Sequence, residues 1–169
     1  MTQLTTLIPV QRASFRDMNC SVAQCLEVVG EWWSLLIVRD ALFGVRRFDD
    51  FQSRLGISRN VLNQRLSRLV DEGILERVAY QDRPPRHEYR PTPKGVDLWT
   101  VVDAMRRWGD HWAAPGGPPV ELRHRRCGNR SEVVPTCSAC GERIEPADAE
   151  PVPGAGATDP DFIPPRSPA

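Results

Sequence analysis

The amino-acid sequence predicts a mainly helical fold that carries one small β-hairpin. Residues 24–43 are apolar on nearly all sides of a helix, which is typical of a buried central helix. Leu62, Leu66 and Leu69 share one face of a later helix that ends near Gly73. Residues 74–80 and 86–90 resemble two short strands on either side of a proline-containing turn.

The helices and the hairpin follow one another in an informative order. Gly44 is a plausible stop for the central helix, and Phe48, Phe51 and Leu55 give the next, short helix one buried stripe. After a tight turn, Ser58 is a good N-cap for the leucine-rich helix. The hairpin follows, and Thr92-Pro93 opens a last long helix. Helix, short helix, turn, helix and hairpin is the order of a winged helix-turn-helix domain.

Composition sets the limits of the chain and divides it into parts. The 169 residues are 40% hydrophobic and 26% charged, which suits one globular domain with an appendage. Eleven of the 16 prolines lie beyond residue 113. We therefore expect five parts, whose bounds are an N-terminal segment at 1–17, the winged helix at 18–112, a linker at 113–120, a second module at 121–150 and a disordered tail at 151–169.

Neither a membrane span nor a secretion signal is expected. The longest apolar run, from Trp32 to Val38, is interrupted by Ser34, and no basic stretch precedes an apolar one at the N-terminus. We therefore expect a cytoplasmic protein whose five cysteines do not form a disulfide framework. The net charge of zero hides an excess of three positive charges in residues 39–90 (11 Arg, 8 acids) and of four negative charges in residues 141–169 (2 Arg, 6 acids).

The leucine-rich helix has the two faces that a DNA-reading helix needs. Opposite its leucines lie Asn60, Gln64 and Ser67, and amides of this kind can hydrogen-bond adenine in the major groove. A merely solvated helix face is the alternative. Arginines before the short helix and in the hairpin turn suit phosphate contacts. The predicted DNA-binding residues are Ser58, Arg59, Asn60, Asn63, Gln64, Ser67, Arg68, Arg83, Arg86, Arg46 and Arg47.

The last helix carries an apolar stripe. Leu98, Val101, Met105, Trp108 and Trp112 recur at spacings of three and four residues. We expect this stripe to pack against a twofold-related copy, because two exposed tryptophans would be a liability in a monomer. The alternative is that the stripe folds back on its own core. A dimer would present two recognition helices to a pseudo-palindromic operator.

The second module contains two short motifs with metal-ligand spacing. The first is HxxCG and the second is CxxCG, and nine residues separate their nearest ligands. His124, Cys127, Cys137 and Cys140 supply the four nitrogen and sulfur donors that tetrahedral zinc requires. We therefore expect a small zinc-ribbon-like module with a structural ion. Accidental spacings in a flexible tail are the alternative.

Residues 20–112 resemble the HxlR family of winged helix-turn-helix transcriptional regulators, which are related to the MarR group. The resemblance rests on CSVAQCLEVVGEWWSLLIVRDAL, RRFDDFQSRLGISRNVLNQRLSRLVDEGILER and PPRHEYRPTPKG. It implies a homodimer that binds double-stranded DNA near a promoter, usually as a repressor. It also implies that Cys20 can sense an oxidant or electrophile, although Ser21 stands where the family usually has proline. An inert buried thiol is the alternative, and Cys25 is interpreted as a core residue.

Two other classes of function compete with a DNA-binding regulator. A thiol- or zinc-dependent enzyme is disfavoured, because no histidine or acid pairs convincingly with a cysteine and the four-ligand site has no open position. His87 and His111 are interpreted as packing or surface residues. A zinc-bearing adaptor, or an RNA-binding protein that has lost DNA contact, is the remaining alternative. We expect no enzymatic activity.

Overall fold

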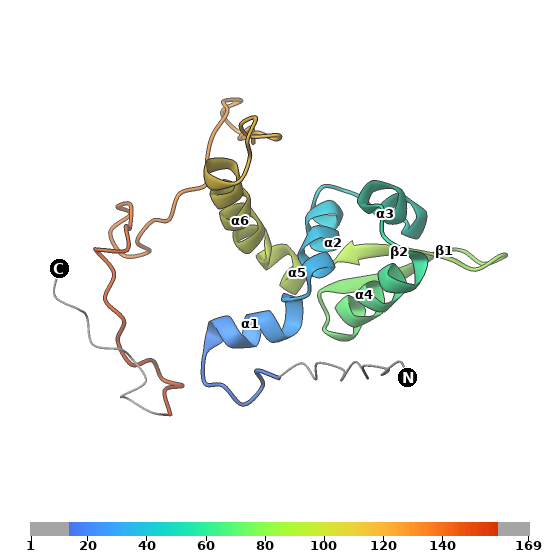
Figure 1. Ribbon diagram of the computed structural model, residues 1–169, viewed down its shortest axis with the longest axis horizontal. Helices are drawn as coiled ribbons and strands as arrows, with labels where there is room; N and C mark the ends of the chain where they lie inside the picture. Colours follow the sequence, from blue (N-terminus) through green and yellow to red (C-terminus); the bar gives the residue numbers. More distant parts are fainter. Residues whose placement is uncertain (1–13, 159–169) are drawn as a thin grey trace, which may run out of the picture.

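The computed structural model describes residues 14–158, and the sequence positions outside that range, 1–13 and 159–169, include most of the predicted N-terminal segment and the end of the predicted tail. Six helices and one two-stranded sheet make up this part of the chain (Figure 1). In chain order they are α1 (Ser21–Val29), α2 (Trp32–Leu42), α3 (Phe48–Leu55), α4 (Arg59–Asp71), β1 (Leu75–Gln81), β2 (Arg86–Pro91), α5 (Pro93–Asp97) and α6 (Trp99–Trp112).

The core lies around α2, which contacts α3, α4, α6 and β2. Ile37 and Val38 of α2 are completely buried there, together with Phe51 of α3. Leu62, Leu66 and Leu69 of α4 are also fully buried, as their helical spacing predicts. Burying these side chains supplies most of the driving force that holds the two helices of the helix-turn-helix against α2.

The prediction of one continuous central helix at 24–43 is wrong, because the structure divides this stretch between α1 and α2. The two helices are bent by 82° at the break between them. Gly30 ends α1, and a β-carbon there would lie 2.4 Å from the carbonyl oxygen of Leu26. Glu31 then adopts an extended backbone. The bend carries α1 away from the core and leaves Val22 and Leu26 exposed.

The predicted last helix is likewise divided, into α5 and α6. Thr92 caps α5 as expected, with its Oγ1 accepting a hydrogen bond from the backbone N–H of Gly95 at 3.2 Å. Gly95 is needed for close packing, because a β-carbon there would lie 2.1 Å from the carbonyl oxygen of Ile74. The chain changes direction at Leu98, which packs against the core, and α6 leaves the domain from that point.

The sheet is an antiparallel hairpin that projects beyond α3 and α4 (Figure 1). Its register pairs Leu75 with Pro91 and Ala79 with His87, and a bulge follows Ala79. Buried Tyr89 fixes the base of the hairpin to the helices, because its N–H donates to the carbonyl oxygen of Arg46 at 2.8 Å. We call this hairpin, β1 and β2 with their turn, the wing.

Residues 113–158 form what we call the C-terminal arm, which leaves the end of α6 and runs around the outside of the domain (Figure 1). From residue 120 to residue 158 every side chain except Leu122, Cys137 and Ile144 is exposed. Near its end the arm returns to the domain, where the Asn19 side-chain amide donates to the Gly156 carbonyl and the Thr158 hydroxyl. Both partners belong to the segment that was predicted to be a disordered tail, of which residues 151–158 contain no helix or strand.

Among residues 14–158 no single helix is long and apolar enough to cross a membrane. The sharply bent pair α1 and α2 passes a length and composition test only when the two helices are taken together.

Candidate nucleic-acid interface

The helix-turn-helix consists of α3, a three-residue turn and α4. Gly56 has a left-handed backbone conformation (φ +63°) that ends α3, and this conformation favours glycine. Ser58 then caps α4, with its Oγ accepting a hydrogen bond from the N–H of Val61 at 3.3 Å. The predicted capping role of Ser58 is thereby confirmed, and the local sequence accounts for the angle at which α4 leaves the turn.

Burial of the leucine stripe directs the opposite face of α4 to solvent. The four polar side chains of that face are Asn60, Asn63, Gln64 and Ser67, and all four are exposed. The side-chain amide of Asn60 lies about one helical turn from those of Asn63 and Gln64. All three amides are accessible to an incoming ligand. A helix of this polarity can enter a DNA major groove with its hydrogen-bonding groups outward.

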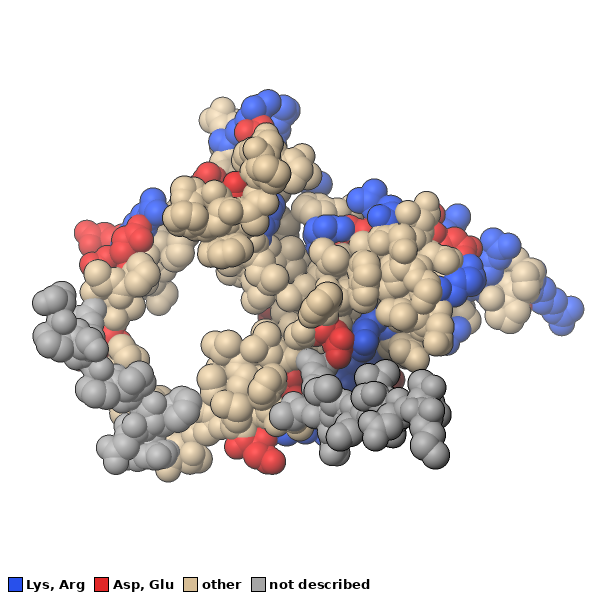
Figure 2. Space-filling model, in the orientation of Figure 1, with Lys and Arg blue, Asp and Glu red and all other residues tan. Residues whose placement is uncertain are grey.

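A groove of about 710 Å³ lies between α3, the start of α4 and the wing. One wall carries Asn60 and Asn63, and the opposite wall belongs to the hairpin. Arginines border the groove on both sides, and basic side chains also gather at the end of the wing (Figure 2). The basic residues that line the groove are Arg47, Arg59, Arg77, Arg86 and His87.

Aromatic rings hold two of these arginines in place. The Arg47 guanidinium lies 5.0 Å from the centre of the Tyr80 ring, and its Nε is 4.0 Å from a Glu88 carboxylate oxygen. The Arg59 guanidinium lies 4.8 Å from the Phe48 ring. Cation–π contacts of this kind order an arginine while leaving its N–H groups able to meet phosphate.

Arg59 also contacts an acidic residue that lines the groove, Asp49. Its Nη1 is 3.0 Å from an Asp49 carboxylate oxygen and 3.0 Å from the Gln52 side-chain oxygen. Both members of the Arg59–Asp49 pair are mostly exposed, so the pair contributes little to stability. A phosphate can therefore replace Asp49 at small cost.

Two residues of the predicted DNA-binding set, Arg46 and Arg68, have intramolecular partners instead. Arg46 is partly buried and donates to the carbonyl oxygens of Ala41 and Val45. Arg68 donates to the carbonyl oxygen of Glu27 at 2.7 Å and pairs with Glu72 at 3.6 Å. The Arg68 contact fixes α4 to α1, and the Arg46 contacts fix the loop before α3 to the end of α2. Both guanidinium groups are thereby directed toward the protein.

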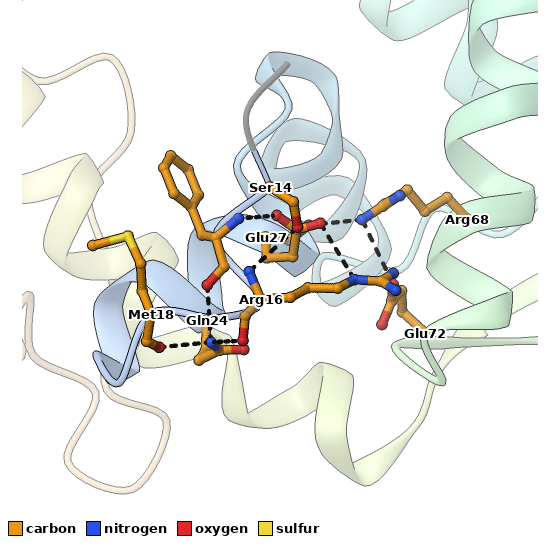
Figure 3. A network of polar contacts seen from close by, with 8 residues as sticks. Ser14, Arg16, Met18, Gln24, Glu27, Arg68 and Glu72 are labelled. Carbon is orange, nitrogen blue, oxygen red and sulfur yellow. Dashed lines mark hydrogen bonds and ion pairs between the residues drawn. The ribbon is translucent and has the colours of Figure 1, made fainter. Parts of the chain in front are cut away.

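The Arg68 contact belongs to a polar network that joins α4 to the segment before α1 (Figure 3). Glu27 accepts a hydrogen bond from the N–H of Phe15 at 2.9 Å and pairs with Arg16 at 3.6 Å. Gln24 donates to the carbonyl oxygens of residues 15, 16 and 18. The residues before α1 are thus attached to the C-terminal half of the recognition helix.

Sequence reasoning missed the contributions of Arg77, Tyr80 and His87. Arg77 lies on β1 and has its Nη2 3.0 Å from Nδ1 of His87 on β2. Their approach depends on the hairpin register and its bulge, which the residue types alone do not specify. The sequence shows basic and aromatic residues on both strands. It does not show which of them the strand register brings together.

The predicted apolar stripe of α6 is divided between the core and the surface. Leu98 packs against the core, whereas Val101, Met105, Trp108 and Trp112 are exposed, the two tryptophans by 65% and 71%. On α1 and just before it, Met18, Val22 and Leu26 are also exposed. A wide opening bordered by α1, α6 and the C-terminal arm lies beside these elements (Figure 2). Large apolar side chains exposed in this number mark an interaction surface.

The two cysteines of the helical domain have different settings. Cys20 is the N-cap residue of α1, partly buried, with an extended backbone. Cys25 is partly buried against the core. Neither forms a disulfide.

The predicted zinc ligands form two separate pairs with the same local fold. Cys127 Sγ lies 3.4 Å from Nδ1 of His124. In the second pair, the backbone N–H groups of Cys140 and Ala139, and then the Cys140 side chain, lower the pKa of the Cys137 thiol. Within residues 14–158 no three metal-binding side chains come together as a cluster. The structure therefore brings the four predicted ligands together two by two, not as a set of four.

The geometry defines a class of protein before any comparison is made: a winged helix-turn-helix domain with a polar recognition helix. The family model described as HxlR-like helix-turn-helix matches residues 28–116. The chain belongs to this family, and it is a transcriptional regulator with a helix-turn-helix DNA-binding domain.

Relatives share more than this domain. A helix-turn-helix-type transcriptional regulator of Mycobacterium tuberculosis is 46% identical over 148 residues, covering 87% of this chain and 94% of the relative. A regulator of the same kind from Synechocystis is 33% identical over 94 residues, which are 55% of this chain and 70% of the relative. Both relatives are named as helix-turn-helix-type transcriptional regulators.

Solved structures agree with this fold. The transcription factor PA1607 is 35% identical, with a TM-score of 0.72, and the match covers 82% of this chain and 97% of that one. PA1374 from Pseudomonas aeruginosa is 40% identical, with a TM-score of 0.61 and coverage of 85% and 97%. The redox regulator HypR in its oxidised form is 30% identical, with a TM-score of 0.52 and coverage of 56% and 99%.

Proposed function

We propose that this regulator is a homodimer that binds a pseudo-palindromic operator and represses transcription by occupying it. The observation that supports sequence reading is the exposed polar face of α4 beside a groove bordered by arginines. Asn63 and Gln64 carry the amides that suit adenine, and Asn60 and Ser67 extend the face. Ser58 contributes the cap that orients the helix.

Phosphate contacts are assigned to arginines on both sides of the recognition helix. Arg47 and Arg59 lie at the start of α3 and α4, and Arg83 and Arg86 are exposed in the wing. Such contacts position the protein on the duplex and carry no base information. We leave Arg46 and Arg68 out of the interface, because their guanidinium groups already bind carbonyl oxygens of the protein.

Dimerisation is supported by the exposed apolar residues of α6 and α1. A partner packed on Val101, Met105, Trp108 and Trp112 would cover the largest exposed apolar side chains of α6. A twofold axis near this surface would place two recognition helices roughly 34 Å apart, which is one turn of DNA. The operator would then contain two inverted half-sites.

The base-reading proposal is tested with duplex DNA selected by the protein from a random pool. Asn63→Ala should weaken binding to the selected operator by about 1–3 kcal/mol, while binding to random duplex is unchanged. Arg83→Ala should weaken both and reduce the salt dependence by about one unit. Asn129→Ala, an exposed residue of the C-terminal arm, is the matched control and should change neither. Equal losses on operator and random DNA for Asn63→Ala would refute the assigned face.

Cys20 is the thiol that we propose for induction by an oxidant or electrophile. It lies at the start of α1, beside Asn19, which binds the end of the C-terminal arm. The similar protein HypR is named a redox regulator. A peroxide would transfer one oxygen atom to the Cys20 thiolate, giving a sulfenic acid and the reduced alcohol or water. Peroxide should lower operator affinity of the wild-type protein and leave Cys20→Ser unaffected. Equal inhibition of both proteins would exclude this role.

For the residues of the predicted second module, 121–150, we propose a structural zinc ion as the organising element. His124, Cys127, Cys137 and Cys140 are the donors, and zinc would supply the cohesion that so few apolar side chains cannot. The short N–S approach in the first pair suits a metal chelate. Metal analysis of protein purified without a histidine tag should find about one zinc per chain, as four ligands per site require.

A further inference from the structure

The two ligand pairs lie in two copies of one small structural unit. We call residues 122–131 knuckle 1 and residues 135–144 knuckle 2. In each, a glycine with positive φ (74° and 77°) donates its N–H to the carbonyl oxygen of the first ligand at 2.8 Å. In each, an isolated bridge closes the base, between Arg123 and Arg130 and between Thr136 and Arg143. Every one of these contacts recurs 13 residues later in the chain.

Knuckle 1 has the ligand separation of half a metal site. A tetrahedral zinc with Zn–S of about 2.3 Å and Zn–N of about 2.05 Å places its sulfur and nitrogen ligands roughly 3.6 Å apart. The 3.4 Å between Cys127 Sγ and His124 Nδ1 is close to that separation. Because zinc in a structural site takes four protein ligands, one knuckle leaves two positions to be filled.

Within one chain, the link between the two knuckles is attached to Arg107 of α6. Arg107 of α6 donates to the carbonyl oxygen of Val133 at 2.6 Å and lies 3.8 Å from a carboxylate oxygen of Glu132. These two residues belong to the short link between the knuckles. Figure 1 shows the loops of the arm on either side of this link well separated from each other.

Separate surface depressions on the two sides of Arg107 support this arrangement. One is lined by Glu121, Leu122 and Arg130 of the knuckle 1 region together with Arg106 and Arg107. The other is lined by Arg107 with Pro135, Arg143 and Ile144 of knuckle 2. Arg107 borders both, and its contacts with Glu132 and Val133 fix the link that lies between the two knuckles.

The match to the solved structure of PA1607 extends beyond the helical domain. The helical domain from residue 21 to residue 112 makes up 92 of the 169 residues, or about 54%. The match to PA1607 covers 82% of the chain and therefore includes part of the C-terminal arm. The arm is almost entirely exposed, so its knuckles are accessible to a second copy of the chain.

We propose that zinc is bound between two copies of the chain, by His124 and Cys127 of one protomer and by Cys137 and Cys140 of the other. This inference rests on the proposed homodimer. A twofold axis makes the exchange reciprocal, so the dimer holds two equivalent sites. Each site combines one neutral imidazole and three thiolates with Zn²⁺, which leaves one negative charge. The neighbouring arginines of knuckle 1, Arg123, Arg125 and Arg126, offset that charge.

Mixed dimers distinguish a shared site from a site within one chain. One full-length chain carries His124→Ala and Cys127→Ser, and the other carries Cys137→Ser and Cys140→Ser. The two chains are co-expressed with two different tags that bind no metal, and the dimer that carries both tags is isolated. A shared site predicts about two zinc ions in the wild-type dimer, one in the mixed dimer and none in either doubly substituted homodimer. A site within one chain predicts two zinc ions in the wild-type dimer, none in the mixed dimer and none in either doubly substituted homodimer.

Chelation of the wild-type protein is a second, independent measurement. If zinc joins the protomers, removal by a chelator should weaken the dimer at least tenfold in sedimentation equilibrium, and added zinc should restore it. An unchanged dimer constant, or a mixed dimer without zinc, overturns the shared site. A wild-type dimer that carries no zinc overturns the metal proposal altogether. Operator binding, measured in parallel at protein concentrations at which the metal-free protein is still dimeric, reports on the proposed function separately because the recognition helix lies outside the arm.

Discussion

Replacing Trp108 with glutamate gives the sharpest test of the proposed dimer. Trp108 is 65% exposed, so its replacement removes few contacts within the protomer. A buried aromatic side chain covers about 150–250 Å², so the exposed part of Trp108 amounts to roughly 130 Å². At about 25 cal/mol per Å², covering it contributes roughly 3 kcal/mol per chain and 6 kcal/mol per dimer. We expect the dimer constant of Trp108→Glu to weaken by about four orders of magnitude, since each 1.4 kcal/mol is tenfold.

Sedimentation equilibrium over a range of concentrations measures this constant directly. Thr100→Glu is the matched control, because it adds the same charge to an exposed position of α6 that lies off the apolar stripe. Circular dichroism should show the same helix content in both variants, and the free energy of unfolding of the monomer should be unchanged. If the Trp108→Glu variant has the same dimer constant as the Thr100→Glu variant, the assignment of α6 to the interface is refuted.

Three further predictions concern the scaffold that positions the recognition helix. Ser58→Ala removes the N-cap bond to Val61 and should lower the free energy of unfolding by about 1 kcal/mol in urea titration, with no change in Ser53→Ala. Leu66→Ala leaves a cavity beneath the fully buried face of α4 and should cost about 2–5 kcal/mol by the same measurement. Gly95→Ala forces a β-carbon against the Ile74 carbonyl, and a decrease of about 1–3 kcal/mol in thermal unfolding is expected. An unfolding free energy equal to wild type in any of these variants contradicts the packing described for it.

The helix-turn-helix could be predicted from the sequence because its determinants are local. The leucine spacing defines the buried face of α4, and Ser58 and the left-handed Gly56 define the turn before it. Exposure of Asn60, Asn63, Gln64 and Ser67 then follows from helical geometry alone. The winged helix-turn-helix plan, and the DNA-binding class that it implies, could therefore be derived before the structure was known.

Breaks within helices depended on contacts that are distant in sequence. Apolar residues continue from α1 into α2, so periodicity could not reveal the 82° bend after Gly30. The division at Leu98 arises where that side chain packs into the core while α6 continues outward. In both places the tertiary arrangement overrides a helical pattern that is continuous in the sequence.

Arginine positions show the same limit for the candidate interface. The sequence placed Arg68 on the edge of the recognition face, but its guanidinium reaches the Glu27 carbonyl, 41 residues earlier in the chain. Arg77 was not among the predicted residues, yet the wing turns it into the groove. A residue type predicts which chemistry is available, whereas the partner that a long flexible side chain selects depends on the assembled fold.

For the two knuckles, the spacing of the ligand residues in the sequence predicts part of the structure but not all of it. The motifs HxxCG and CxxCG predict two turns that each bring one pair of candidate ligands together, because each pair lies within four residues and its glycine permits the closing hydrogen bond. Spacing carries no information on which pairs meet, because that depends on Arg107 holding the link between them to α6, a contact across 26 residues. Four donors divided into two half-sites cannot satisfy tetrahedral zinc until another pair arrives. The same α6 that contacts the link between the knuckles exposes the apolar stripe proposed to recruit a second copy, so dimerisation and metal binding would be coupled through one helix.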